Sequence, residues 1–459
     1  MAVSPLLSRG QTVQELKDLS AFKNPGPTWK MVGSVRASLE EAGELSLTSG
    51  SAVLVNDLSK SAHGKDLYSV GEFGDMDLEL DYMMARGSNS GIYLQGRYEL
   101  QLLDSWGVST PSYGDNGGIY ERWDSSKPAG SEGYEGRAPR QNVSRAPGIW
   151  QHLEVSFRAP RFDASGKKIE NAVIEKVVLN GALIHENVVL SGPTRGPVSE
   201  DEVAKGPLRI QGDHGAVAFR NIRITERAAN DRQEEREERQ LPDPIYVNAP
   251  VNRTLRSFMD IPGKRVVHSI SAGSREHVHY TYDLDHGALF QVWRGGFLDA
   301  TPMWHSRGDG SSRPRGAKVF LGEPVFGVVS LASAQAAWPV DTAGSNFRPE
   351  GYSLDDEDRP VFHYQIYGAS VTDATKALEN GEGLLREISV SGGNDRFYHL
   401  AASAEKIEQV GRDTYLIGDS AWYIHLSDPG NAKPILRDKD GMKQLLIPVK
   451  EKISYSILF

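Results

Sequence analysis

Short segments in which apolar and polar residues alternate recur along most of the chain, and no extended segment has the period of a helix. Residues 77–82 (DLELDY) place three apolar side chains on one face of an extended strand and three carboxylates on the other. Asn180 and Gly181, between two further strand-like runs, are typical of a two-residue hairpin turn. This pattern predicts an all-β chain whose N-terminal part is a jelly-roll or related sandwich.

The 459 residues divide at a charged segment. Residues 230–239 (NDRQEEREER) are almost wholly polar, and Pro242 and Pro244 follow them. The residues beyond are again rich in short strands. We therefore predict a jelly-roll domain at 20–227, a linker at 228–245 and a second β-sandwich domain at 246–459. We also expect one short helix at 13–18 (VQELKD).

Composition excludes several classes of function. The chain has no cysteine, so disulfides, thiolate metal sites and cysteine nucleophiles are absent, and any metal must use histidine and carboxylates. The net charge of −10 argues against nonspecific binding of nucleic acid. No convincing phosphate loop, dinucleotide fingerprint or haem-attachment motif is present, so we expect no nucleotide, flavin or haem. A divalent metal ion is the one cofactor left open.

The chain carries no sign of a membrane span or an export signal. No apolar run approaches the roughly 18 residues of a membrane-spanning helix, and residues 1–10 lack the features of a signal peptide. We expect a periplasmic or secreted protein whose signal is not part of this sequence, with the cytoplasm as the alternative.

Residues 98–104 (YELQLLD) carry the first candidate site. In a strand Glu99 and Gln101 share one face, while the apolar residues between them enter the core. Asp104 lies at odd spacing and joins that face only across a β-bulge. A carboxylate on a sheet face beside aromatic loops suits acid–base chemistry on a sugar. The alternative is an ordinary solvated outer face.

A second candidate site lies between two strands within residues 206–224. Gln211, Asp213 and His214 occur together there, with glycines that allow tight turns. A carboxylate beside an imidazole can share a proton with it or help to hold a divalent cation. Equally, Asp213 could cap backbone amides in a polar turn. His185, on a neighbouring strand, is a third candidate, although a lone strand histidine is more often structural.

A long segment rich in glycine and aromatic residues, 105–144, interrupts the strands. Loops of this length are usually functional. Its aromatic side chains could stack on sugars or pin the loop to the body: Trp106, Tyr113, Tyr120, Trp123 and Tyr134. Arg97, Arg122 and Arg137 could donate hydrogen bonds to sugar hydroxyls or could simply be surface charge.

The second region offers weaker signals. His277 and His279 have the spacing of metal ligands on one strand face, but without a third ligand a structural role is favoured. Residues 293–308 are dense in tryptophan, arginine and glycine and predict a binding loop or, slightly favoured, a stacked structural corner.

Residues 20–226 resemble the bacterial 3-keto-disaccharide hydrolase family. The resemblance is carried by several separated stretches: 72–80 (EFGDMDLEL), 87–104 (GSNSGIYLQGRYELQLLD), 117–120 (GGIY), 148–152 (GIWQH), the turn at 179–181, and 206–224. It implies a concanavalin A-like jelly roll that acts on glycosides oxidised to a ketone at C3. The ketone acidifies the C2 hydrogen, so a base can remove it, the C1 substituent leaves, and water adds. Residues 250–459 resemble a β-rich module of large bacterial multidomain proteins.

The same strand is similar to the Glu-x-Asp-x-x-Glu motif of family-16 glycoside hydrolases. Glu99, Gln101 and Asp104 occupy its three positions, so the middle carboxylate is missing and the last is shortened. A retaining pair needs carboxyl groups about 5–5.5 Å apart, and this departure favours elimination, or a different pairing of carboxyl groups, over double displacement.

Together these observations predict a carbohydrate-cleaving enzyme without nucleic-acid partners. The predicted catalytic residues are Glu99, Asp104, Asp213 and His214, of which Glu99, Asp213 and His214 could bind a metal. The predicted substrate-binding residues are Tyr93, Gln95, Arg97, Gln101, Trp106, Tyr120, Trp123, His185 and Gln211. A non-catalytic, lectin-like protein is the alternative, since the same fold serves lectins.

Overall fold

The computed structural model describes residues 12–58, 64–227, 243–306, 308, 310–393, 396–428 and 433–459. The chain divides into two compact units, Met1–Leu241 and Pro242–Phe459. The charged segment 228–242, most of the predicted linker, lies outside the described residues. Within the described part only two short helices interrupt the strands, the 3-10 helix Leu19–Ala21 and α1 (Thr301–Trp304). None of these described helices has the length and apolar character needed to cross a bilayer.

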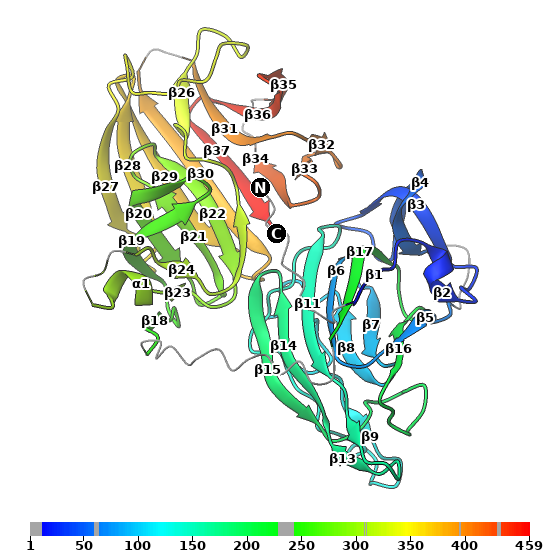
Figure 1. Cartoon of the computed structure of the whole chain (residues 1–459). Helices are drawn as coiled ribbons and strands as arrows, with labels where there is room; N and C mark the ends of the chain where they lie inside the picture. Colours follow the sequence, from blue (N-terminus) through cyan, green and yellow to red (C-terminus); the bar gives the residue numbers. More distant parts are fainter. Residues whose placement is uncertain are drawn as a thin grey trace. The chain divides into compact units, whose positions relative to one another are not determined.

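The first unit contains a long antiparallel sheet, seen in Figure 1 as the layer with β11, β14 and β15. Its strands, in spatial order, are β15 (Ala182–Leu190), β14 (Ala172–Leu179), β11 (Gln151–Arg158), β6 (Met76–Met84), β17 (Val217–Glu226), β4 (Leu45–Asn56) and β3 (Trp29–Ala37), with β1 (Thr12–Glu15) beside β17.

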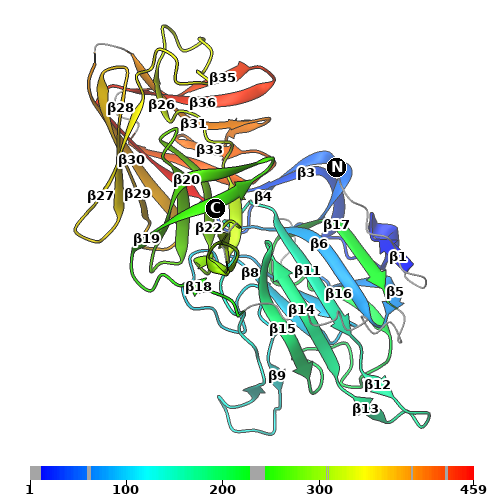
Figure 2. The same ribbon diagram turned by 60° about the vertical axis from the view of Figure 1, so that its left-hand side comes forward.

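A five-stranded sheet forms the second layer. Its spatial order is β2 (Phe22–Lys23), β5 (Leu67–Phe73), β16 (Gly206–Ile210), β7 (Asn89–Leu94) and β8 (Tyr98–Leu103). Its strands β5, β8 and β16 are labelled in the turned view of Figure 2. Two small hairpins accompany the layers: β9 (Arg122–Trp123) with β10 (Gly133–Tyr134), and β12 (Arg161–Phe162) with β13 (Lys168–Glu170).

Apolar side chains from the two sheets meet in the core of the first unit. Tyr98 of β8 and Phe157 of β11 pack with ring centroids 5.5 Å apart, and both are fully buried. Leu100 and Leu102 point the same way from β8 and are fully buried as well. This alternation is what the sequence predicted, and the all-β jelly-roll fold class is confirmed.

Two local predictions can be compared with the strands directly. The Asn180–Gly181 hairpin is confirmed: the two residues have φ values of 53° and 80°, both positive, as a type I′ turn requires. The helix expected at 13–18 is wrong. Residues 12–15 instead form β1, because their backbone groups pair with the open edge of β17, Thr12 opposite Glu226.

The second unit is also a sandwich. Its larger sheet has the order β27 (Arg348–Leu354), β28 (Pro360–Ile366), β29 (Ala369–Ala377), β30 (Gly383–Gly392), β37 (Lys452–Leu458), β34 (Trp422–Asp428), β33 (Thr414–Ile417) and β32 (Ile407–Gln409). A five-stranded sheet faces it: β19 (Arg253–Ile261), β20 (Lys264–Gly273), β21 (Val278–Asp283), β22 (Ala288–Arg294) and β25 (Ala317–Phe320). Tyr282 of β21 stacks on Phe362 of β28 at 3.8 Å, within a core built from both sheets.

Two smaller sheets complete the second unit. One has the order β26 (Val328–Ser330), β31 (Phe397–Ala404), β36 (Met442–Val449) and β35 (Ile435–Lys439). The other has the order β18 (Tyr246–Val247), β23 (Leu298–Asp299) and β24 (Arg313–Pro314). The predicted second β-sandwich is therefore confirmed.

Candidate functional site

A row of polar side chains crosses the outer face of the five-stranded sheet. Glu99 lies opposite Tyr93, Tyr93 opposite Arg209, and Arg209 opposite Tyr68 in the strand register. Because side chains directly opposite each other share a face, these four residues of β8, β7, β16 and β5 form one continuous row. We call it the polar row. It includes Glu99, the principal catalytic residue expected from the sequence.

Glu99 is a buried carboxyl group, with only 2% of the residue exposed. Burial disfavours the carboxylate and raises its pKa to about 7. A hydrogen bond from the Tyr93 hydroxyl and the positive charge of Arg209 oppose that rise, while the charges of Asp66 and Asp213 add to it. A carboxyl group poised near neutral pH can both accept and donate a proton.

Gly91 makes room for this carboxyl group. It lies on β7 beside Tyr93, and a Cβ built there would lie 2.3 Å from Oε1 and 3.1 Å from the carboxyl carbon of Glu99. A larger residue at this position would therefore displace the carboxyl group of Glu99. The glycine is thus required by close approach of a side chain, a role that the sequence pattern alone did not reveal.

Arg209 is held in a fixed orientation. Its guanidinium lies 4.1 Å from the centre of the Tyr93 ring, and its Nε donates to Asp66 Oδ2 at 2.6 Å. Asp66 Oδ1 also accepts the amide hydrogen of Gly212 at 3.0 Å. Sequence reasoning missed both Arg209 and Asp66. The available signal was a charged residue between Leu208 and Ile210, two fully buried positions of one strand.

The long loop 105–144 adds a strand-like edge beside β8. The Gln101 amide donates to Gly118 O at 2.8 Å, and the Tyr120 amide donates to Glu99 O at 3.1 Å. The Gln101 side chain, also buried, donates to Asn89 Oδ1 at 2.7 Å. Tyr120 is brought close to the row, where burial and the nearby acidic groups Glu121 and Glu99 raise its pKa.

A second segment passes over the row. Gly196 O accepts from Arg209 Nη1 at 2.5 Å, and the Tyr93 hydroxyl lies 3.4 Å from Arg195 O. The Arg195 guanidinium in turn stacks on Trp123 at 3.8 Å from the ring centre. The sequence predicted that Trp123 stacks on sugar, but one face of its ring is already occupied by the Arg195 guanidinium.

The turn between β16 and β17 carries the second candidate site. Asp213 and His214 are exposed there, and His214 Nδ1 lies 2.5 Å from Asp213 Oδ1. Gln211 fixes the start of the turn through its backbone, whose amide donates to Gly91 O at 2.9 Å. In the part of the chain that the structure describes, no three histidine, aspartate or glutamate side chains are grouped to hold a metal ion. Glu99, Asp213 and His214, the ligand set suggested by the sequence, are therefore not grouped as metal ligands in the described residues.

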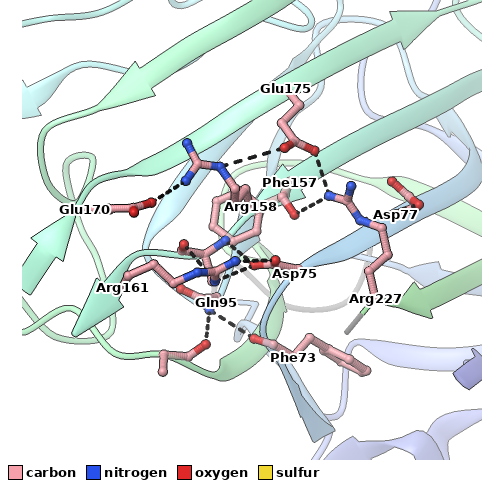
Figure 3. Close-up of polar contacts among 12 residues, drawn as sticks. Phe73, Asp75, Asp77, Gln95, Phe157, Arg158, Arg161, Glu170, Glu175 and Arg227 are labelled. Atoms are coloured by element: carbon pink, nitrogen blue, oxygen red, sulfur yellow. Dashed lines mark hydrogen bonds and ion pairs between the residues drawn. The ribbon is translucent and has the colours of Figure 1, made fainter. Parts of the chain in front are cut away.

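Several predicted substrate-binding residues lie away from the polar row. Gln95 occupies the β7–β8 turn at φ 53°, and its side-chain amide donates to the carbonyls of Phe73 and Ala204. Figure 3 shows the contact with Phe73. Arg97 donates to Asp201 O at 2.6 Å and to Gln95 O at 2.8 Å. Both side chains tie loops to the sheet rather than line the row.

Three more predicted residues make local contacts. His185 Nε2 lies 2.8 Å from Gly117 O, and burial lowers its pKa to about 4, so it is neutral and holds the long loop. Asp104 accepts the amide hydrogen of Gly87 at 2.8 Å. Trp106 follows in the same loop and is half-buried. None of the three is part of the polar row.

A cluster of ion pairs lies at the larger sheet of the first unit. Arg161 pairs with Asp75, and Arg227 pairs with Glu175 at 2.8 Å (Figure 3). Arg158 extends this cluster to Glu170 at 2.7 Å. Every charge shown has a partner, and the cluster joins strands instead of presenting a free cation.

The histidines and tryptophan singled out in the second unit have structural contacts. His277 lies before β21 at φ 58°, so it does not share a strand face with His279. His279 is buried, with Nε2 2.9 Å from Gly295 O and Nδ1 accepting from the Ser274 amide. Trp293 donates to the carbonyls of Gly296 and Phe297 at 3.0 Å each.

Comparison with known proteins finds one family match, within the first unit. Residues 15–225 match the family model of the 3-keto-alpha-glucoside-1,2-lyase-like domain. No functionally curated protein matches the chain.

Solved structures add only distant similarities. Two crystal structures of candidate glycosyl hydrolases from Parabacteroides distasonis are 22% and 20% identical to the chain. They cover 50% and 47% of it, and 94% and 100% of their own chains, with TM-scores of 0.32 and 0.31. TM-scores this low identify neither the fold nor the function.

Proposed function

We propose that the first unit, which carries a 3-keto-alpha-glucoside-1,2-lyase-like domain, cleaves the C1 substituent from glycosides that bear a ketone at C3. The observation that supports this most is the buried Glu99 carboxyl group, with a pKa of about 7, held between Tyr93 and Arg209. Removal of a proton next to a ketone is most efficient with a base whose pKa lies near the working pH, and Glu99 meets that requirement at neutral pH.

The reaction proceeds by elimination and then hydration. The Glu99 carboxylate takes the C2 proton, and the C2–H electron pair forms an enolate with the C3 carbonyl. Return of that pair forms the C1–C2 double bond and breaks the bond from C1 to the leaving oxygen, which receives the proton from Glu99. Water then adds across the double bond, its hydroxyl to C1 and its proton to C2.

The neighbours of Glu99 supply stabilisation of the enolate oxygen. Arg209 is a cation fixed by Asp66, and the Tyr93 hydroxyl is a donor whose pKa burial holds well above its usual range. Preorganised donors of this kind lower the barrier because they need no reorganisation as charge develops. Glu99 is nearly fully buried, and the Arg195–Gly196 segment contacts its neighbours Tyr93 and Arg209, so the proposal includes movement of this segment when substrate enters.

A substrate comparison tests the proposal. The protein should release the aglycone from p-nitrophenyl 3-keto-α-glucoside and leave p-nitrophenyl α-glucoside intact, because only the ketone acidifies the C2 hydrogen. Release is followed by absorbance of the phenolate. Deuterium at C2 should slow the reaction if proton removal limits the rate. Binding of either compound without any release would instead support a lectin-like protein.

The activity should also depend on the ionisation of Glu99. Because the carboxylate is the active form and its pKa is about 7, kcat/KM should fall about tenfold per pH unit below that value and level off above it. A pH–rate profile from pH 5 to 9 measures this. A profile that is flat across pH 5–8 would contradict a role for Glu99 as the base.

A further inference from the structure

The second unit contains a cavity of about 420 Å³, a volume typical of small-molecule sites. Leu289, Phe326 and Trp338 are among the apolar side chains that line it, while Arg386, His399 and Tyr455 line it with polar groups. All three polar residues are at least 95% buried. Buried polar groups gathered at a cavity are unusual, since each must be satisfied.

The three polar side chains form one hydrogen-bonded chain. His399 Nδ1 lies 2.6 Å from Gly327 O, which can only accept, so Nδ1 carries the proton. His399 Nε2 is then an acceptor, and the Tyr455 hydroxyl donates to it at 2.9 Å. The Tyr455 oxygen accepts in turn from Arg386 Nη1 at 3.1 Å. The donor and the acceptor of each of these three hydrogen bonds are therefore assigned.

The buried carboxylate of Asp373 holds Arg386, the last member of this series of hydrogen bonds. Arg386 Nε and Nη2 donate to Asp373 at 3.0 and 2.6 Å, and Tyr282 donates to the same carboxylate at 3.0 Å. The Arg386 charge is thus compensated from behind. Burial and the Arg386 charge hold the pKa of His399 well below its usual range, so the histidine is neutral.

The charge balance of the cavity favours an uncharged ligand. Arg386 is paired with Asp373, and the lining residue Glu323 is paired with Lys264. The two other charged lining residues, Lys439 and Asp440, balance each other. On the wall, Trp338 is half-buried, and its indole is held by donation to Phe326 O at 3.0 Å. An aromatic wall beside fixed hydrogen-bonding groups suits a ring with apolar C–H faces and polar edges.

We propose that this cavity binds a neutral hexose or hexoside, with its ring against Trp338 and its hydroxyls toward Arg386 and Tyr455. The second unit would then hold a carbohydrate independently of the polar row in the first unit. The two proposals stand on different residues, so either can fail alone.

Titration of the full chain with methyl α-D-glucoside, followed by calorimetry, tests this site. Trp338→Ala should weaken binding by about tenfold or more, and Tyr455→Phe by about three- to tenfold. Trp304→Ala is the matched control, because Trp304 is half-exposed on α1 and does not line the cavity; it should leave the dissociation constant unchanged.

The outcomes separate cleanly. Release of aglycone from the 3-keto substrate should be unaffected by Trp338→Ala, which shows that the first unit is intact. Absence of binding by the unsubstituted chain would overturn the proposal. So would binding that both Trp338→Ala and Tyr455→Phe leave unchanged while thermal unfolding shows both variants to be folded, because the sugar would then sit elsewhere.

Discussion

Replacing Glu99 with glutamine is expected to lower kcat on a 3-keto-glucoside by about 10² to 10⁴-fold. Glutamine keeps the length of the side chain above Gly91 and can still accept the hydrogen bond from Tyr93, but it cannot take a proton. The loss should therefore appear in kcat with little change in KM. Steady-state kinetics of Glu99→Gln at pH 8, where the wild-type residue is mostly ionised, measures the effect.

Glu79→Gln is the matched control. Glu79 is a half-exposed carboxylate of β6 on the other sheet, where it pairs with Arg223 and does not touch the polar row. Its substitution should leave kcat within about twofold. Glu99→Gln should also remain folded, since the raised pKa of Glu99 means that the wild-type protein loses stability as the pH rises from about 4.5 to about 7. A folded Glu99→Gln variant that keeps a third of the wild-type kcat would contradict the assignment of Glu99 as the base.

The sequence predicted that both units are sandwiches, and it predicted which side chains of β8 enter the core. Both predictions follow from the period-two alternation, which places side chains on alternate faces regardless of tertiary context. The sequence also predicted that Glu99 and Gln101 would share the outer face of that strand. It did not predict their burial. That depends on Gly91 and on the loop segments around 118 and 195, which reach β7 and β8 from distant parts of the chain.

The remaining site predictions show the same limit. Arg209 became recognisable only when strand register placed it beside Tyr93, since the sequence holds the two 116 positions apart. His185 and Gln95 were chosen by residue type, yet the side chain of each is hydrogen-bonded to a backbone carbonyl and so fixes a loop. Asp213 and His214 were expected to join Glu99, but a turn of small residues leaves them in solvent. Residue type and spacing predict chemistry well only where the backbone is regular.

The buried ion pair of the second unit should have the largest effect on stability. Asp373 is fully buried and Arg386 is 5% exposed at its side chain, and the pair is bidentate. Asp373→Asn leaves the guanidinium buried without a compensating charge. We expect the free energy of unfolding of the second unit to fall by about 3 to 5 kcal/mol. Urea unfolding of the full chain, followed by circular dichroism, measures the transition that the substitution shifts.

An exposed pair provides the contrast. Asp438 accepts from Lys443 at 3.0 Å with most of its side chain in solvent, so Asp438→Asn should change the free energy of unfolding by less than about 1 kcal/mol. Removing both buried partners, in Asp373→Leu with Arg386→Met, should recover much of the lost stability, because no charge is then left unpaired. If instead the double variant were as unstable as Asp373→Asn, the loss would come from packing and hydrogen bonds rather than from an uncompensated charge.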